Sequence, residues 1–174
     1  DYVWVLSDAL LIENSILDEI LYVISKNHCE IIALNAINRN INFPSKLYSD
    51  SNLILDRFGW HLTLMGAAVY SKKVIAFSRE LNFSRYKNFP HFFLIFNYIS
   101  KRASFYWINT KSISSSKKKS YWQNHIFDVF LTDWSKVVRS LSDKYNSEII
   151  ERTLINHSKN TNIFSLKSLF FLKY

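Results

Sequence analysis

Two short apolar runs separated by a helical pattern constrain the fold of this chain most strongly. Residues 2–7 begin Tyr-Val-Trp-Val-Leu and residues 30–35 read Glu-Ile-Ile-Ala-Leu-Asn, and such β-branched and aromatic runs predict buried strands. Between them, apolar residues at helical spacing predict an amphipathic helix with the stripe Ile12, Ile16, Leu17, Ile20, Leu21 and Ile24. A strand, a helix and a second strand in this order predict an α/β sheet covered on both faces.

The remaining sequence alternates between helical and extended patterns. Helices are predicted near 52–59, 74–81, 91–99 (with Pro90 in the first turn), 122–141 and 146–157. A strand or turn is predicted over 62–70 and a strand over 103–108. A polar loop is predicted over 38–52 and a flexible basic loop over 111–120. No apolar run reaches the ~20 residues that span a bilayer. We therefore expect one α/β domain over residues 1–174, with a sheet-containing part over 1–112 and a helical part over 120–174.

Net charge and cysteine content limit the partners and the kinds of site that this chain can have. The formal net charge is +8, and a basic surface favours phosphate-bearing partners such as nucleotides, anionic lipids or nucleic acid. The aromatic content of 17% fits a single-strand nucleic-acid binder, but an A/T-biased coding sequence gives the same enrichment, and no nucleic-acid-binding motif is present. The single cysteine, Cys29, excludes an intramolecular disulfide and a cysteine-only zinc site.

Residues 1–12 resemble a segment of a known enzyme family. Asp-Tyr-Val-Trp-Val-Leu-Ser-Asp, followed by Leu11-Ile12 and a helix, is similar to the mid-chain segment of bacterial family-two glycosyltransferases, which have the GT-A fold and build capsule, O-antigen or exopolysaccharide. Residues 62–72 resemble the acceptor-side segment of that family, and residues 86–92 and the helix at Tyr121-Trp122 have counterparts in position and character. The resemblance covers most of residues 1–141. It implies a GT-A-like mixed sheet, and we expect the chain to be the later part of a longer protein whose nucleotide-binding first half is missing.

The resemblance also implies a metal site at the end of the first strand. In the family, a strand of this kind delivers a cluster of two or three aspartates to the mouth of the sugar-nucleotide cleft. This chain has Asp8-Ala9-Leu10 at that place, so one carboxylate remains. Asp8 is therefore the expected ligand of Mg²⁺ or Mn²⁺, hard cations that prefer oxygen and that neutralise a departing diphosphate.

Four further positions are candidate site residues. Asp56 is a candidate base for the acceptor hydroxyl, and its alternative is a solvated helix aspartate. His91 is a candidate acid or base, because imidazole titrates near neutral pH, and its alternative is a helix-start histidine that faces solvent or caps the helix. His61 and Trp122 are assigned to the acceptor side. The alternative for His61 is packing, and the alternatives for Trp122 are a core position and a membrane-facing position. Asp8 is also assigned to the donor diphosphate.

The basic run Lys117-Lys118-Lys119 precedes the helix predicted over 122–141. Three cations at a helix N-terminus oppose the helix dipole, whereas a phosphate bound there would be attracted by both the ammonium groups and the free N–H groups. We expect this run to contact the diphosphate of a donor or of a lipid-linked acceptor. The alternative is a solvated loop.

The leading functional expectation is a glycosyltransferase, or a fragment of one, in cell-surface polysaccharide synthesis. It would transfer a sugar from a nucleotide-sugar donor to a saccharide or lipid-linked acceptor, in the cytoplasm or peripherally on the inner face of the membrane. Inverting and retaining chemistry both stay open. The alternatives are a catalytically inactive remnant and a basic non-enzymatic module that binds membrane or nucleic acid.

Overall fold

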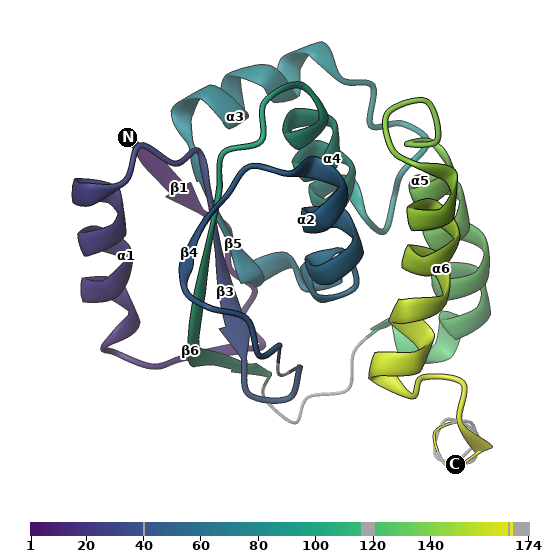
Figure 1. Cartoon of the computed structure of the whole chain (residues 1–174). Helices are drawn as coiled ribbons and strands as arrows, with labels where there is room; N and C mark the ends of the chain where they lie inside the picture. Colours follow the sequence, from purple (N-terminus) through teal and green to yellow (C-terminus); the bar gives the residue numbers. More distant parts are fainter. Residues whose placement is uncertain (40, 116–120, 167, 169–174) are drawn as a thin grey trace.

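The computed structural model describes residues 1–39, 41–115, 121–166 and 168 and has an α/β architecture (Figure 1). The six strands are β1 (Tyr2–Trp4), β2 (Leu10–Ile12), β3 (Ile31–Ala36), β4 (Lys46–Tyr48), β5 (Ala68–Ser71) and β6 (Phe105–Ser115). The α-helices are α1 (Ile16–Lys26), α2 (Ser51–Phe58), α3 (Lys72–Phe77), α4 (Pro90–Lys101), α5 (Trp134–Arg139) and α6 (Ser147–Thr161).

The strands form one mixed sheet in the order β1-β5-β3-β6-β2, with β4 also paired to β6. Strands β3 and β6 are parallel, and β5 runs antiparallel to both β1 and β3. Strands β1, β3 and β6 therefore point in the same direction. Their carboxyl ends and the amino end of β5 meet at one end of the sheet, which positions the candidate site described below.

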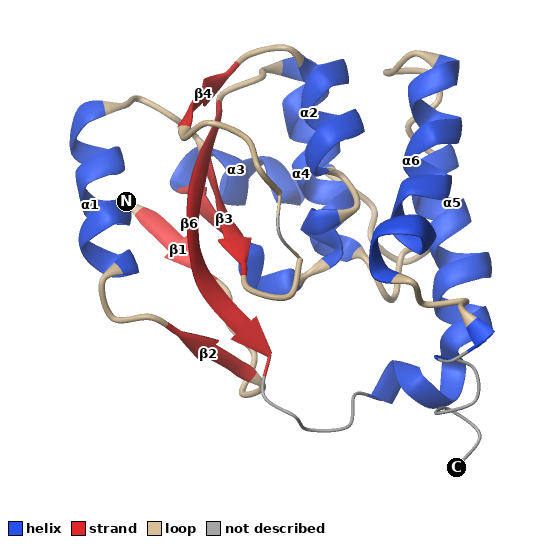
Figure 2. Ribbon diagram, turned by 60° about the horizontal axis from the view of Figure 1, so that its bottom comes forward, coloured by secondary structure: helices blue, strands red, loops and turns tan. Residues whose placement is uncertain are grey.

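Helices cover the sheet in layers (Figures 1 and 2). Helix α1 lies on one face, and α2, α3 and α4 lie on the other. Helices α5 and α6 pack outside α2 and α4, so that the C-terminal part adds a further helical layer. The core between sheet and helices is strongly aromatic, and its largest fully buried side chains include Phe58, Phe92, Phe96, Phe105 and Trp107.

Two predictions, the buried strand over 30–35 and the helix that starts near Pro90, are confirmed. Strand β3 is buried along its whole length, as a continuous apolar run between two neighbours requires. Helix α4 begins with Pro90 in its first turn, where the missing N–H leaves no hydrogen bond unmade. Helices α1, α2, α3 and α6 also form close to the predicted ranges.

The prediction that residues 2–7 form a buried inner strand is wrong. Strand β1 is shorter and lies at the edge of the sheet, with β5 as its neighbour. Val3 is 46% exposed and Val5 is 42% exposed, so one side of this segment faces away from the core. Apolar composition alone does not distinguish an edge strand from a central one, because both pack one face on the core.

The structure also contains strands that the sequence did not predict. Strand β2 uses Ile12, which was assigned to the first helix, and β4 lies inside the predicted loop over 38–52. Strand β6 continues through residues 111–115, which were expected to be a flexible loop. Ile113 is fully buried there and pairs with both Ile12 and Ala36, so sheet pairing outweighs the serine- and lysine-rich composition.

The predicted long helix over 122–141 is divided. A 3₁₀ segment covers Tyr121–His125, a π-helical segment covers Asp128–Asp133, and α5 follows. The predicted apolar side chains Ile126, Phe130, Trp134, Val137, Val138 and Leu141 are nevertheless buried, whereas Phe127 is exposed. Among the described helices, none is both long enough and apolar enough to cross a membrane.

Candidate functional site

The candidate site lies at the end of the sheet where β1, β3 and β6 terminate. The chain leaves β1 into the turn that holds Asp8, and it leaves β3 into the segment that holds Arg39. Before entering β5 at the same end, the chain forms a 3₁₀ turn over His61–Thr63. In open α/β sheets, ligands bind outside the carboxyl ends of the strands, so this end is the place to search for function.

Arg39 ties two of these segments together. Its Nη1 donates to the Thr63 hydroxyl at 2.6 Å and to the carbonyl oxygens of Trp60 and His61, each at 3.3 Å. All three acceptors are formally neutral. Among the described residues, no carboxylate forms an ion pair with Arg39. Burial lowers the pKa of the guanidinium to about 10, which leaves it charged at neutral pH.

His61 is completely buried beneath this arginine. Its Nε2 lies 2.8 Å from the Leu34 carbonyl oxygen, its Nδ1 lies 3.1 Å from the Arg39 carbonyl oxygen, and its ring packs edge-on against Trp107. Burial, helped by the positive charge of Arg39, lowers the pKa of His61 to about 4. The structure therefore gives His61 the packing environment of the alternative reading, rather than a place on an open acceptor surface.

His91 lies in the first turn of α4 and reaches the same cluster. Its Nε2 is 3.2 Å from the Thr63 carbonyl oxygen, and its side chain is partly buried. Burial is the main cause that lowers the pKa of His91 to about 4, so the imidazole is neutral at pH 7. A base with this pKa removes a proton from a hydroxyl group only weakly.

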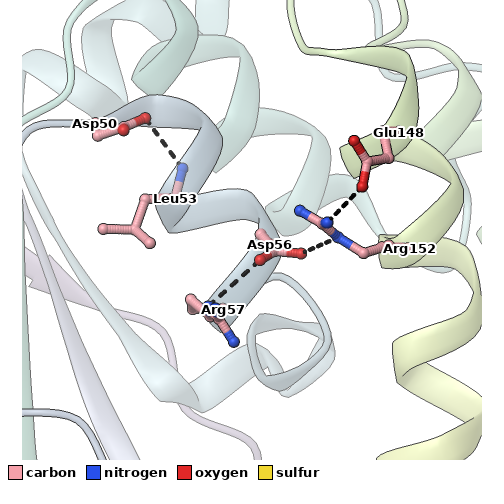
Figure 3. A network of polar contacts seen from close by, with 6 residues as sticks. All are labelled: Asp50, Leu53, Asp56, Arg57, Glu148 and Arg152. Carbon is pink, nitrogen blue, oxygen red and sulfur yellow. Dashed lines mark hydrogen bonds and ion pairs between the residues drawn. The ribbon is translucent and has the colours of Figure 1, made fainter.

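Asp56 is held in an ion-pair network between α2 and α6 (Figure 3). Its Oδ1 accepts from Arg152 Nε at 2.9 Å, and its Oδ2 lies 3.3 Å from Arg57 Nε. Arg152 also donates to Glu148, and Asp50 caps the start of α2 by accepting from the Leu53 N–H group. This environment differs from both sequence readings, because Asp56 is neither open to an acceptor nor simply solvated.

The structure describes two of the remaining predicted positions, Asp8 and Trp122. Asp8 is exposed in the turn between β1 and β2. Trp122 is partly buried and packs edge-on against Phe130 with 5.4 Å between ring centroids, so packing describes it better than an open sugar platform. Lys117, Lys118 and Lys119 lie outside the described residues.

The described residues do not by themselves fit a Mg²⁺ or Mn²⁺ site. Across residues 1–39, 41–115, 121–166 and 168, no three His, Cys, Asp or Glu side chains converge into a group that could hold a metal. Asp8 supplies one carboxylate on an exposed turn, so substrate phosphates and water would have to complete the coordination of Mg²⁺. The expected metal stays a prediction.

Sequence reasoning missed Arg39 and Thr63. Arg39 lies in the predicted polar loop over 38–52, and Thr63 lies in the apolar segment over 62–70 that was predicted as a strand or turn. A usable signal was present for Arg39, because it follows the predicted buried strand over 30–35 by four residues, at the end where sheet ligands bind. Its contacts with residues 60–63 depend on tertiary structure and have no local signal.

A concave surface lies at the opposite end of the sheet. A cleft of about 510 Å³ is lined by residues that include Tyr2, Cys29, Glu30 and Lys73. Its chemically notable groups are paired with one another: the buried Glu30 carboxylate lies 2.9 Å from Lys73 Nζ and accepts from the Tyr98 hydroxyl. Burial raises the pKa of the Cys29 thiol to about 11, which makes it a poor nucleophile.

Comparison of the chain with protein-family models, with curated proteins and with solved structures found no match.

Proposed function

We propose that the chain forms part of a GT-A-type glycosyltransferase that acts at the carboxyl end of the sheet. It would transfer a sugar from a nucleotide-sugar donor to a saccharide or lipid-linked acceptor. One observation carries the proposal: the common direction of β1, β3 and β6 brings the Asp8 turn, Arg39 and the segment before β5 to one end of the sheet. The resemblance of residues 1–12 to the family supplies the reaction class.

The chemistry assigned to this end is the binding and stabilisation of a nucleoside diphosphate. A departing diphosphate accumulates negative charge, and a fixed cation in a partly buried site stabilises that charge better than water does. Arg39 has this character. Asp8 would accept hydrogen bonds from hydroxyl groups of the donor, because a carboxylate repels a diphosphate.

The edge position of β1 counts against the proposal. An inner strand would have enclosed the Asp8 turn between two neighbours, whereas β5 is the one strand among the described residues that pairs with β1. Arg39 and the residues 60–63 that it contacts lie on the β5 and β3 side of this end, and the donor would bind against them.

A second candidate function is binding without turnover, as in an inactive glycosyltransferase-like domain. The observation that favours it is the state of the two residues expected to move protons. Asp56 is engaged by Arg152, and His91 is buried enough to lower its pKa to about 4. Neither group is poised to deprotonate an acceptor hydroxyl near neutral pH.

Calorimetric titration of the chain with UDP, GDP and TDP, and with nucleotide sugars of each, tests both candidates. Each titration is run with Mn²⁺ and with EDTA. Saturable binding that weakens in an Asp8→Ala variant supports the proposed site, and release of nucleoside diphosphate in the presence of acceptor supports turnover. Binding without release favours the second candidate. Absence of binding by folded protein to every donor would refute both.

A further inference from the structure

Arg39 is a partly buried cation whose neighbours do not neutralise it. A charge removed from water is costly unless it is paired, and the neutral acceptors of Nη1 satisfy only part of the guanidinium. Neither Nε nor Nη2 donates to a described residue. Since Nη1 is the anchored nitrogen, the free edge is the Nε–Nη2 edge, which presents two parallel N–H groups.

Among the described residues, Arg39 influences three buried or partly buried histidines and pairs with no carboxylate. His61, His91 and His157 lie near enough for its positive charge to help keep them neutral. Among the described residues no Asp or Glu forms an ion pair with it. The cluster therefore carries one uncompensated positive charge in an environment of reduced dielectric constant, where an anion would be bound more strongly than at the surface.

The anchor of Arg39 is itself fixed. The Thr63 hydroxyl donates to the Trp60 carbonyl oxygen at 2.9 Å, so it has no proton left for a ligand and serves as an acceptor for Arg39. Thr63 is thus a positioning residue that holds the guanidinium in one orientation. A pre-oriented arginine loses less conformational freedom when it binds an anion than a flexible surface arginine does.

The N-terminus of α4 approaches the same cluster. His91 in its first turn contacts the Thr63 carbonyl oxygen, and no side chain caps this helix. The positive end of the helix dipole adds to the attraction for an anion near Arg39.

We infer that the Nε–Nη2 edge of Arg39 binds a phosphoryl group, with Thr63 as its positioning residue and the α4 N-terminus beside it. A planar guanidinium edge matches two oxygens of one phosphate, which an ammonium group cannot do. The site itself is argued from these residues alone, and its assignment to the diphosphate of a sugar donor rests on the proposed function.

The test measures binding of inorganic pyrophosphate to the chain at 0.15 M salt. Arg39→Lys keeps the charge but loses the two-point edge, and Arg39→Met loses both. Because a charge-assisted hydrogen bond is worth more than a neutral one, we expect affinity to fall roughly 10-fold in R39K and roughly 100-fold in R39M. The matched control is Arg79→Met, which removes the same charge from an exposed arginine and should change affinity less than about twofold.

A measurement on the unmodified chain covers the case in which the variants fail to fold. The Arg39 Nε–H resonance should shift on addition of pyrophosphate. An unmoved resonance, no saturable binding by the folded chain, or an equal loss of affinity in R39M and R79M would overturn the inference.

Titrations with different phosphate-bearing ligands separate this inference from the proposed function and identify the source of the phosphate. If pyrophosphate binds through Arg39 but no nucleotide sugar binds, the inference stands and the proposed function fails. If UDP binds equally to the unmodified chain and to R39M, the inference fails and the proposed function stands. Comparing binding to vesicles that carry a lipid diphosphate with binding to soluble UDP shows whether an acceptor lipid or a nucleotide supplies the phosphoryl group. Either result supports the inference, provided that R39M loses the binding.

Discussion

Arg152 Nε of helix α6 donates to Asp56 Oδ1 of helix α2 at 2.9 Å, and this bond fastens the C-terminal helical layer to the layer that covers the sheet (Figure 3). Asp56 is 11% exposed at its side chain, whereas Arg152 is 47% exposed. The carboxylate is thus committed to a contact between helices.

Replacing Asp56 should change stability rather than catalysis. In Asp56→Asn we expect the free energy of unfolding to fall by about 1 kcal/mol, since the pair is only partly removed from solvent. Arg152→Met should cost a similar amount, and the double variant should cost less than the sum, as expected for residues in contact. Urea denaturation measures all three. The control is Glu148→Gln, which removes an exposed (i, i+4) partner of Arg152 and should cost about 0.3–0.5 kcal/mol. If transfer activity is found and D56N abolishes it without loss of stability, Asp56 is the base after all.

Stability should fall on acidification because of the buried histidines. Burial lowers the pKa of His61 to about 4 and of His157 to about 3, whereas both titrate near 6.5 when unfolded. Below pH 6.5 the unfolded chain binds protons that the folded chain does not, so the stability present above that pH is lost as the pH falls. The loss from each histidine is about 1.4 kcal/mol at pH 5.5.

His157→Phe isolates one of these contributions. The His157 ring stacks on Phe130, is fully buried, and its Nε2 has no hydrogen-bond partner among the described residues, so an aromatic ring without nitrogen can replace it. Between pH 7.5 and 5.5 the variant should lose about 1.4 kcal/mol less than the unmodified chain does. Identical pH profiles in thermal unfolding would contradict this prediction.

Glu30 should be essential to the stability of the end of the sheet that lies opposite Arg39. It is a buried carboxylate held by Lys73 at 2.9 Å, by the Tyr98 hydroxyl and, more distantly, by Arg102 at 3.9 Å. Glu30→Gln should lower the free energy of unfolding by about 2 kcal/mol, because three groups lose a charged partner. Lys73→Met serves as the control and should cost less than 1 kcal/mol, since Tyr98 and Arg102 remain and Lys73 is largely exposed. An equal loss of unfolding free energy in the two variants would show that the whole network contributes no more than the Glu30–Lys73 pair alone.

The two glycines should differ in their tolerance of a methyl group. A Cβ at Gly59 would lie 2.5 Å from the Leu55 carbonyl oxygen and 3.3 Å from Thr153 Cγ2, so backbone at the end of α2 must move away from α6. A Cβ at Gly66 would meet Leu10 Cδ1, the end of a side chain that can rotate. We expect Gly59→Ala to cost about 1–3 kcal/mol, in the range of overpacking, and Gly66→Ala to cost less. Chemical denaturation of both variants checks the order, and the reverse order would show that Leu10 is the more rigid neighbour.

The predictable parts of this fold are those with a strong local pattern. Strand β3 and helix α4 follow from continuous apolar character and from Pro90 in the first turn. Strands β2 and β4 have three residues each and exist because β6 offers them an edge, which no local window contains. For the same reason the edge position of β1 could not be read from its apolar residues.

The candidate site was predictable only in outline. Asp8 follows from the resemblance and from its place after a strand. The burial of His61 depends on Trp107, which is distant in sequence, and the cluster around Arg39 forms when residues 60–63 fold back over the end of β3. A basic residue in a polar loop is usually solvated, so its unpaired state could be recognised only in three dimensions.

The long strand β6 has a consequence for how the chain is made. On its outer edge, β4 pairs with its first residues and β2 pairs with its last residues, Ile113 to Ser115. During synthesis β2 emerges early but has no partner until Ser115 has left the ribosome, and a strand this short is not stable unpaired. Pulsed hydrogen exchange during refolding should therefore detect protection of the β3–β5 amides first and of the Leu11 neighbourhood last.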